Sequence, residues 1–126
     1  MKSKIFLAMI GLVVSLITGC YYDVVTPANT NAPPQFVSFS GDLQPIFDRS
    51  CNKSGCHDGV AHEPDLTANN SYNSITAGGF INTTIPTESI LYQEVATGGM
   101  PLGGTPLSAD ETQKVLDWIR NGAPNN

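Results

Sequence analysis

The sequence predicts a small all-α domain in which a few short helices are joined by long loops. Apolar residues recur at helical spacing in three short stretches, whereas alternation of apolar and polar residues is nowhere sustained over five positions. The 126 residues include 12 Gly and 9 Pro, which favour turns and end helices. So thin and loop-rich a core is expected to need a cofactor, a metal or a crosslink to complete it.

The first 19 residues are typical of a secretory signal peptide. Lys2 and Lys4 precede an apolar run, Ile5 to Ile17, which is shorter than the roughly 20 residues that a membrane-spanning helix needs. The run ends in Ile17-Thr18-Gly19-Cys20, which resembles the lipobox of bacterial lipoproteins, where cleavage precedes a lipidated cysteine. We therefore expect a lipid anchor on Cys20, with an ordinary signal peptide and a chance cysteine as the alternative.

The residues after Cys20 are expected to form a flexible tether over 20–39. This stretch contains three prolines and no helical period, which is typical of an extended spacer. The chain would then be held on a membrane of the bacterial cell envelope, periplasm-facing or surface-exposed. Tyr21 stands where the inner-membrane retention signal has Asp, which favours the outer membrane. A disordered end without a role is the alternative for the tether.

The folded domain is expected to span residues 40–126 and to begin with a helix capped by Ser40. Leu43, Ile46 and Phe47 lie at spacings that place them on one helix face, and Pro45 is tolerated in the first turn. A single short turn is expected from Ser71 to Thr76.

Two further helices are expected in the second half of the domain. Thr87 can cap a segment that places Ile90, Leu91 and Val95 on one side and ends at Gly98-Gly99. Ser108 and Glu111 form the pattern of a capping box. The helix that follows is expected to bury Val115, Leu116 and Ile119, with Trp118 beside them, and to end at Gly122.

The charge of the chain argues against nucleic-acid binding. Without Lys2 and Lys4, only four cations remain against eleven Asp and Glu. A protein that binds phosphate groups needs a basic surface, which this composition does not provide. The acidity instead favours a protein partner with a basic docking face.

The segment Cys51-Asn52-Lys53-Ser54-Gly55-Cys56-His57 carries the most specific chemical pattern. Two thiols on one short loop can each add to a haem vinyl group, and a histidine directly after the second thiol can face the iron. The usual attachment motif is C-x-x-C-H. This chain has C-x4-C-H, in which the adjacency of Cys56 and His57 is kept and Gly55 gives the longer path freedom to bulge.

With this motif in view, the chain resembles the small class I-like cytochrome c domains of bacterial envelope lipoproteins. The likeness extends to four other segments: Leu43–Phe47, Asp65–Thr67, Met100–Gly104 and the closing stretch Asp110–Pro124. It implies one covalent haem c held by thioethers at Cys51 and Cys56, with His57 as the proximal and Met100 as the distal iron ligand. It further implies an electron carrier that passes single electrons to a redox partner protein, and not an enzyme.

Met100 is also a candidate ligand on its own account. It is the only methionine outside the leader, and it lies on a Gly-Gly-Met-Pro segment that can present its thioether. Ordinary core packing is the alternative. His62 is the rival ligand, but its closeness to His57 in the sequence makes an approach to the opposite haem face awkward, so a solvated loop position is preferred.

The surroundings of the site are predicted less specifically. A proximal histidine normally donates its second ring N–H to a carbonyl or carboxylate, and the Pro64 carbonyl is the candidate here. Trp118 and Tyr92 could touch the haem, although core packing explains each of them equally well. Arg49 could pair with a propionate, but a solvated surface charge is preferred.

Two other functional classes stay open. A haem peroxidase would need an open distal position with His62 or Glu63 beside it. A haem-free lipoprotein could link Cys51 to Cys56 by a disulfide, since the envelope is oxidising, or hold zinc with His57 and His62. The adjacency of Cys56 and His57 is poor geometry for two ligands of one zinc ion.

Overall fold

A computed structural model describes residues 29–126, and every regular element in that range is helical. The all-α prediction is therefore confirmed for the described residues. The predicted signal peptide and Cys20 lie outside them. None of the helices within 29–126 has the length and apolarity needed to cross a membrane. In chain order the elements are η1 (Phe39–Leu43, a π turn), α2 (Gln44–Ser50), α3 (Ser71–Ala77), η2 (Pro86–Glu88), α4 (Ile90–Ala96) and α5 (Ala109–Arg120).

Helix α5 is the longest element of the described residues, and it forms as its sequence predicts. The Ser108 side chain accepts from the Glu111 N–H, and the Glu111 carboxylate accepts from the Ser108 N–H, which completes the capping box. Val115, Leu116 and Ile119 are fully buried, and so is Trp118. The helix ends before Gly122, whose positive φ of 88° favours glycine.

The start of the first helix differs from the prediction. Ser38 caps it, and its Oγ accepts from the Gly41 N–H at 3.0 Å. Ser40 lies inside the π turn, where its Oγ donates to the carbonyl of Asn126 at 2.8 Å, so the predicted Ser40 cap is wrong. Leu43, Ile46 and Phe47 are buried as predicted, and Pro45 occupies the first turn of α2.

Helix α4 also begins later than its sequence suggests. Thr87 belongs to η2, and Ser89, with an extended backbone, is the N-cap of α4, so the predicted Thr87 cap is wrong. Leu91 and Val95 are buried, but Ile90 keeps 48% of its surface exposed. Ile90 opens the helix and does not share its core-facing side. Helix α3 is one residue longer than the predicted Ser71–Thr76 segment.

An aromatic cluster forms the centre of the core. The Phe39 ring lies 5.2 Å from both the Trp118 and the Tyr72 rings and 6.1 Å from the Phe47 ring. The Trp118 indole N–H donates to the carbonyl of Pro124 at 2.9 Å. These contacts bring η1, α2, α3 and α5 together around one apolar centre.

Residues 29–39 lie along α5, although the sequence predicted a tether up to residue 39. The Gln35 N–H donates to Asp117, Arg120 donates to the carbonyl of Ala32, and Val37 is buried. The folded domain therefore begins before residue 40, because the polar side of α5 offers partners to the backbone of this segment.

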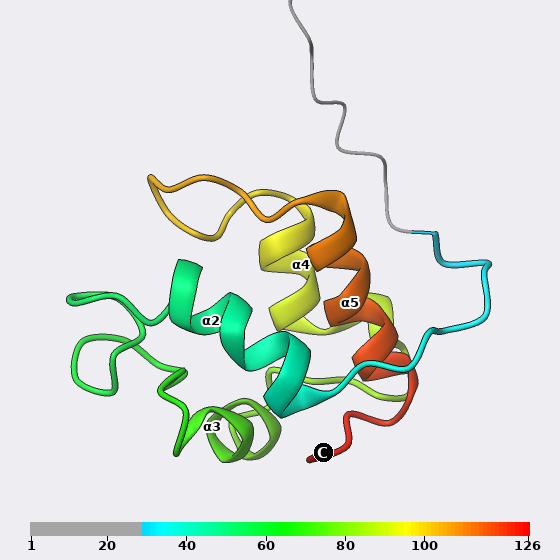
Figure 1. Cartoon of the computed structure of the whole chain (residues 1–126), viewed down its shortest axis with the longest axis horizontal. Coiled ribbons are helices and arrows are strands. Elements are labelled where there is room, and N and C mark those ends of the chain that lie inside the picture. Colours follow the sequence, from blue (N-terminus) through cyan, green and yellow to red (C-terminus); the bar gives the residue numbers. More distant parts are fainter. Residues whose placement is uncertain (1–28) are drawn as a thin grey trace, which may run out of the picture.

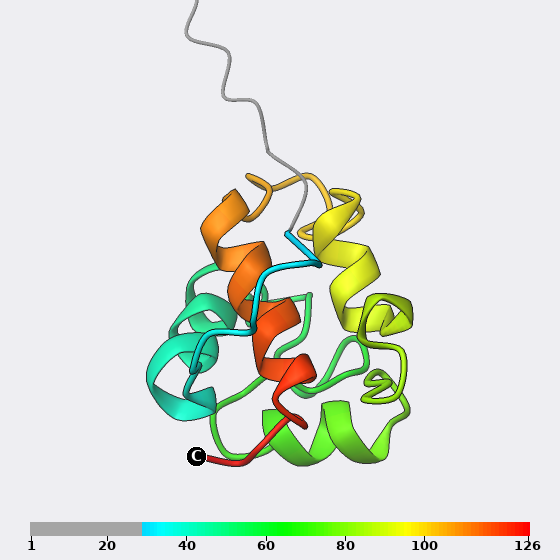
Figure 2. The same ribbon diagram turned by 90° about the vertical axis from the view of Figure 1, so that its right-hand side faces the viewer.

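The two longest loops project on the same side of the helices. Figure 1 shows residues 51–66 and 97–108 at one edge of the molecule, with the beginning of the segment 29–39, in cyan, at the opposite edge. Helices α4 and α5 run side by side, and the second loop joins their upper ends in both Figure 1 and Figure 2. This arrangement places the ends of α2 and α4 between the loops.

Candidate functional site

A cavity of about 490 Å³ lies between the two loops, the end of α2 and the exposed side of α4. This volume falls within the roughly 300–1,000 Å³ typical of cofactor and ligand pockets. All four residues predicted to hold a cofactor line it, namely Cys51, Cys56, His57 and Met100. The remaining wall is mostly apolar and includes Phe47, Leu66, Phe80, Ile90, Leu91, Val95, Pro101 and Leu102.

Backbone hydrogen bonds close residues 51–57 into a turn, which accommodates the longer spacing between the two cysteines. The Lys53 N–H donates to the Cys51 carbonyl at 2.9 Å, and the Cys56 N–H donates to the Lys53 carbonyl at 2.8 Å. The His57 N–H then returns to the Cys51 carbonyl at 3.3 Å. The two additional residues therefore bulge outward while Cys51, Cys56 and His57 stay on one cavity wall.

The two cysteines differ in environment. Cys51 ends α2 with 9% of its surface exposed, whereas Cys56 is exposed on the loop, and both thiols are free. Burial raises the pKa of Cys51 to about 11, and the nearby charge of Arg49 offsets only part of this increase. Cys51 is therefore a neutral thiol near pH 7.

The His57 ring is fixed by a hydrogen bond to a backbone carbonyl. Its Nδ1 lies 2.9 Å from the carbonyl oxygen of Pro64, which can only accept, so Nδ1 is the donor. The Leu66 N–H donates to the His57 carbonyl at 3.0 Å and holds the backbone as well. The predicted bond to Pro64 is thus confirmed. It leaves the Nε2 lone pair of a neutral imidazole available to bind a metal.

Asp58 and Asp65 organise the loop that carries His57. Asp58 accepts from the N–H groups of Gly55, Val60 and Ala61, and these hydrogen bonds lower the pKa of its carboxyl group. Gly59 has a φ of 84°, and a Cβ there would meet the Asp65 carboxylate at 3.0 Å. A glycine is therefore required at this close approach.

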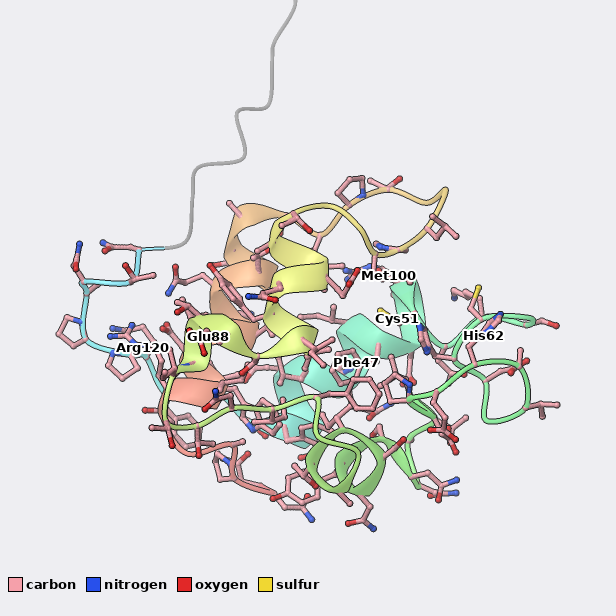
Figure 3. The ribbon with its side chains drawn as sticks, turned by 180° about the vertical axis from the view of Figure 1, so that it is seen from behind. Phe47, Cys51, His62, Glu88, Met100 and Arg120 are labelled. Carbon is pink, nitrogen blue, oxygen red and sulfur yellow. The ribbon has the colours of Figure 1, made fainter. Side chains whose placement is uncertain are left out.

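Met100 reaches the cavity from the opposite loop. Its N–H donates to the Glu94 carbonyl at 3.0 Å, just after α4 ends, and its side chain is half-buried on the cavity wall. Gly98, with a φ of 74°, lets the chain turn there. In Figure 3, Met100 and Cys51 lie on the cavity side of the molecule, His62 lies farther out on its loop, and Glu88 and Arg120 lie on the other side.

The remaining candidates separate into those on the cavity and those away from it. His62 and Glu63 line the cavity, and His62 is exposed. Trp118 and Tyr92 are not part of the wall, and Trp118 belongs to the aromatic core. Arg49 forms an ion pair with Glu111 and does not line the cavity.

The zinc alternative would require several of these side chains around one ion. Between residues 29 and 126, no three His, Cys, Asp or Glu side chains come close enough together to hold a metal ion. A site with one histidine and one methionine as protein ligands needs no such cluster.

Several residues of the cavity wall belong to no motif of the sequence. Phe80 precedes η2 outside any helical pattern, and Glu94 lies outside the apolar stripe of its helix. A signal was nevertheless present, because Ile90 and Glu94 are four residues apart and so share one face of α4, next to the face that carries Leu91 and Val95.

Comparison with known proteins yields no match to this chain among family models, curated proteins or solved structures.

Proposed function

We propose that this chain is a monohaem c-type cytochrome that carries single electrons in the bacterial cell envelope, held there by a lipid on Cys20. One observation carries the proposal. A single apolar cavity is lined by two cysteines, by a histidine whose Nδ1 is already hydrogen-bonded, and by the only methionine outside the leader.

The residues around the cavity fit a covalently bound haem. Apolar walls from α2, α4 and residues 100–102 suit a flat, mostly apolar ring, and the two thiols lie on one wall. When bound, haem supplies reversible one-electron chemistry between ferrous and ferric iron. The thin core expected from the composition gives a further reason for the chain to enclose such a group.

Each side chain has a distinct role in the proposal. His57 would hold the iron through Nε2, and the Pro64 carbonyl holds the ring in a fixed orientation. Met100 would be the second protein ligand, and ligation by histidine and methionine raises the reduction potential of a haem. The thiols of Cys51 and Cys56 would hold the haem covalently as thioethers.

The proposal describes an electron carrier and not an enzyme. With His57 and Met100 both holding the iron, no coordination site would be left for a peroxide. His62 and Glu63 then serve no acid–base role, in line with the exposure of His62 on its loop. The favoured location is the outer membrane.

The test is covalent haem retention after export of the chain together with c-type maturation proteins. The wild type is expected to keep its haem on a denaturing gel and to gain the mass of one haem. Cys51→Ser and Cys56→Ser should each leave at most one thioether, and the double variant should lose all covalent haem. Ser54→Ala, on the exposed turn between the cysteines, is the matched control and should keep it.

The axial ligands are tested by the spectrum of the same protein. Met100→Ala should retain covalent haem but change from six-coordinate low-spin to high-spin iron. A wild-type chain that carries no haem, while a control cytochrome matures in the same cells, would overturn the proposal. A low-spin spectrum unchanged in Met100→Ala would overturn the role of Met100.

A further inference from the structure

We propose that the mouth of the cavity is a docking face for a redox partner that presents an apolar centre surrounded by lysine and arginine side chains. This inference rests on the proposed electron-transfer function and identifies the chemistry of the partner. It is carried by the distribution of charge and of exposed apolar side chains around the cavity.

Each cation of the described residues is engaged by another group, although Lys53 lies on the turn between Cys51 and Cys56, two residues of the cavity wall. Three of them form ion pairs: Arg49 with Glu111, Lys114 with Asp42 and Asp110, and Arg120 with Asp117. The fourth, Lys53, directs its ammonium group to the backbone carbonyl of Asp48 at 2.9 Å. None of the four lines the cavity.

The mouth itself is acidic. Glu63 and Glu94 line the cavity, and Asp58 and Asp65 lie on the loop that carries His57. Across residues 29–126, none of these four carboxylates forms a salt bridge. Glu63 is held in place, since it accepts from the Asp65 N–H and the Ser74 hydroxyl, both at 3.2 Å. On the cavity wall and the 51–66 loop, these four carboxylates outnumber the single lysine, Lys53, so the net charge where the proposed cofactor would be reached is negative.

Apolar side chains at the same mouth remain open to solvent. Leu102 keeps 85% and Ile90 keeps 48% of its surface exposed, although both line the cavity. Residues 29–39 do not cover this face, because they lie along α5 and begin at the opposite edge of the molecule (Figure 1). An apolar centre surrounded by acidic side chains is complementary to a partner surface whose apolar centre is surrounded by basic side chains.

The test compares electron transfer from the reduced holoprotein to two inorganic oxidants. Tris(phenanthroline)cobalt(III) is a trivalent cation with apolar aromatic ligands, and hexacyanoferrate(III) is a trivalent anion; each accepts one electron as the haem iron goes from ferrous to ferric. At low ionic strength, the double variant Glu63→Gln/Glu94→Gln should lower the rate of electron transfer to the cationic oxidant about threefold to tenfold. It should raise the rate of electron transfer to the anionic oxidant. The difference should vanish near 1 M salt, where the screening length is about 3 Å.

The use of two oxidants separates docking from a change in reduction potential. A shift in potential alters both rates in the same direction, whereas charge at the docking face alters them in opposite directions. Glu88→Gln is the matched control, because Glu88 is an exposed acid without a salt bridge on the side of the molecule away from Met100 and Cys51 (Figure 3). It should leave the ratio of the two rates unchanged.

The apolar centre is tested by Leu102→Ser. This change should lower the rate of electron transfer to the cobalt complex more than the rate to hexacyanoferrate. Phe36 is a similarly exposed apolar residue on the α5 side, and Phe36→Ser should change neither rate. Equal effects of the Glu63/Glu94 and Glu88 variants in a haem-loaded protein would overturn the docking face and leave the proposed function standing. A chain that binds no haem would overturn both.

Discussion

The α5 side of this domain fills its interior with its own side chains, whereas the side of the two long loops encloses a cavity of about 490 Å³. On the first side, Phe39, Tyr72 and Trp118 meet ring to ring, and the indole N–H is satisfied. On the second, Ile90 and Leu102 line the cavity and remain exposed. The difference indicates that side chains fill the interior of one half of the domain, while in the other half they leave a cavity open.

If the two sides are packed differently, truncating an apolar side chain should lower the free energy of unfolding more on the α5 side than on the cavity side. Ile119→Ala removes a fully buried side chain from α5 and is expected to lower the free energy of unfolding by about 2–5 kcal/mol. Ile90→Ala makes the same change on the cavity wall, where it should cost no more than about 0.5 kcal/mol in the cofactor-free chain. Urea unfolding followed by circular dichroism measures both. Equal losses would show that the cavity wall is packed as tightly as the core.

The edge of the packed side provides a second, smaller test. Asp117 is buried and accepts from the Gln113 amide at 2.9 Å, from the Gln35 N–H at 3.1 Å and from Arg120 at 3.3 Å. Asp117→Ala leaves these three donors without this partner and should destabilise the fold by about 1–3 kcal/mol. Hydrogen exchange should increase in residues 32–39 but not in the cavity loop 55–66.

The matched control for this test is Asp110→Ala. Asp110 lies on the same helix, is largely exposed, and pairs with Lys114 only at 3.8 Å, so its loss should leave exchange unchanged. Faster exchange in loop 55–66 of Asp117→Ala would contradict the separation of the two sides.

The smallest expected effect concerns the pH dependence of the cavity loop. Hydrogen bonds from Gly55, Ala61 and Val60 lower the pKa of Asp58 below its ordinary value of 3.8 in the folded state. A group with a depressed folded pKa contributes stability above its ordinary value and loses it as the pH falls through the folded pKa. The loop should therefore loosen only below about pH 4.

The loosening of this loop can be followed through the Val60 and Ala61 amide signals by NMR. In Asp58→Asn, this acid transition should disappear from the two amides, because the titrating group is gone, while the signals of α5 stay as in the wild type. A transition that persists in the variant would assign it to another carboxylate of the loop.

Parts of the site could be read from the sequence because they depend on near neighbours. The bond from His57 to Pro64 spans seven residues, and the Cys51–Cys56 turn closes within six. Which residues form the opposite wall could not be read in this way. In the sequence, Ile90 has the same helical spacing as a core residue. In the structure, the N-cap is Ser89, so Ile90 is the first residue of α4 and lies on the cavity side.

The helix starts show the same division. Ser108 and Glu111 form a reciprocal cap from atoms three residues apart, so the pattern alone predicts it. Ser40 is as good a capping residue as Ser38, but its hydroxyl is bonded to Asn126, 86 residues away. Such a competing contact is invisible to local propensity.

By itself the sequence determined the helical class, the apolar stripe of α5 and the adjacency of Cys56 and His57, since each depends on spacing along a few residues. Only the tertiary structure decided that Met100, 43 residues beyond His57, lines the same cavity, that residues 29–39 belong to the packed domain, and that Trp118 is a core residue. The physical reason is that a cavity and a core are made by side chains from distant segments, whose meeting depends on how the helices pack and not on the preference of any one segment.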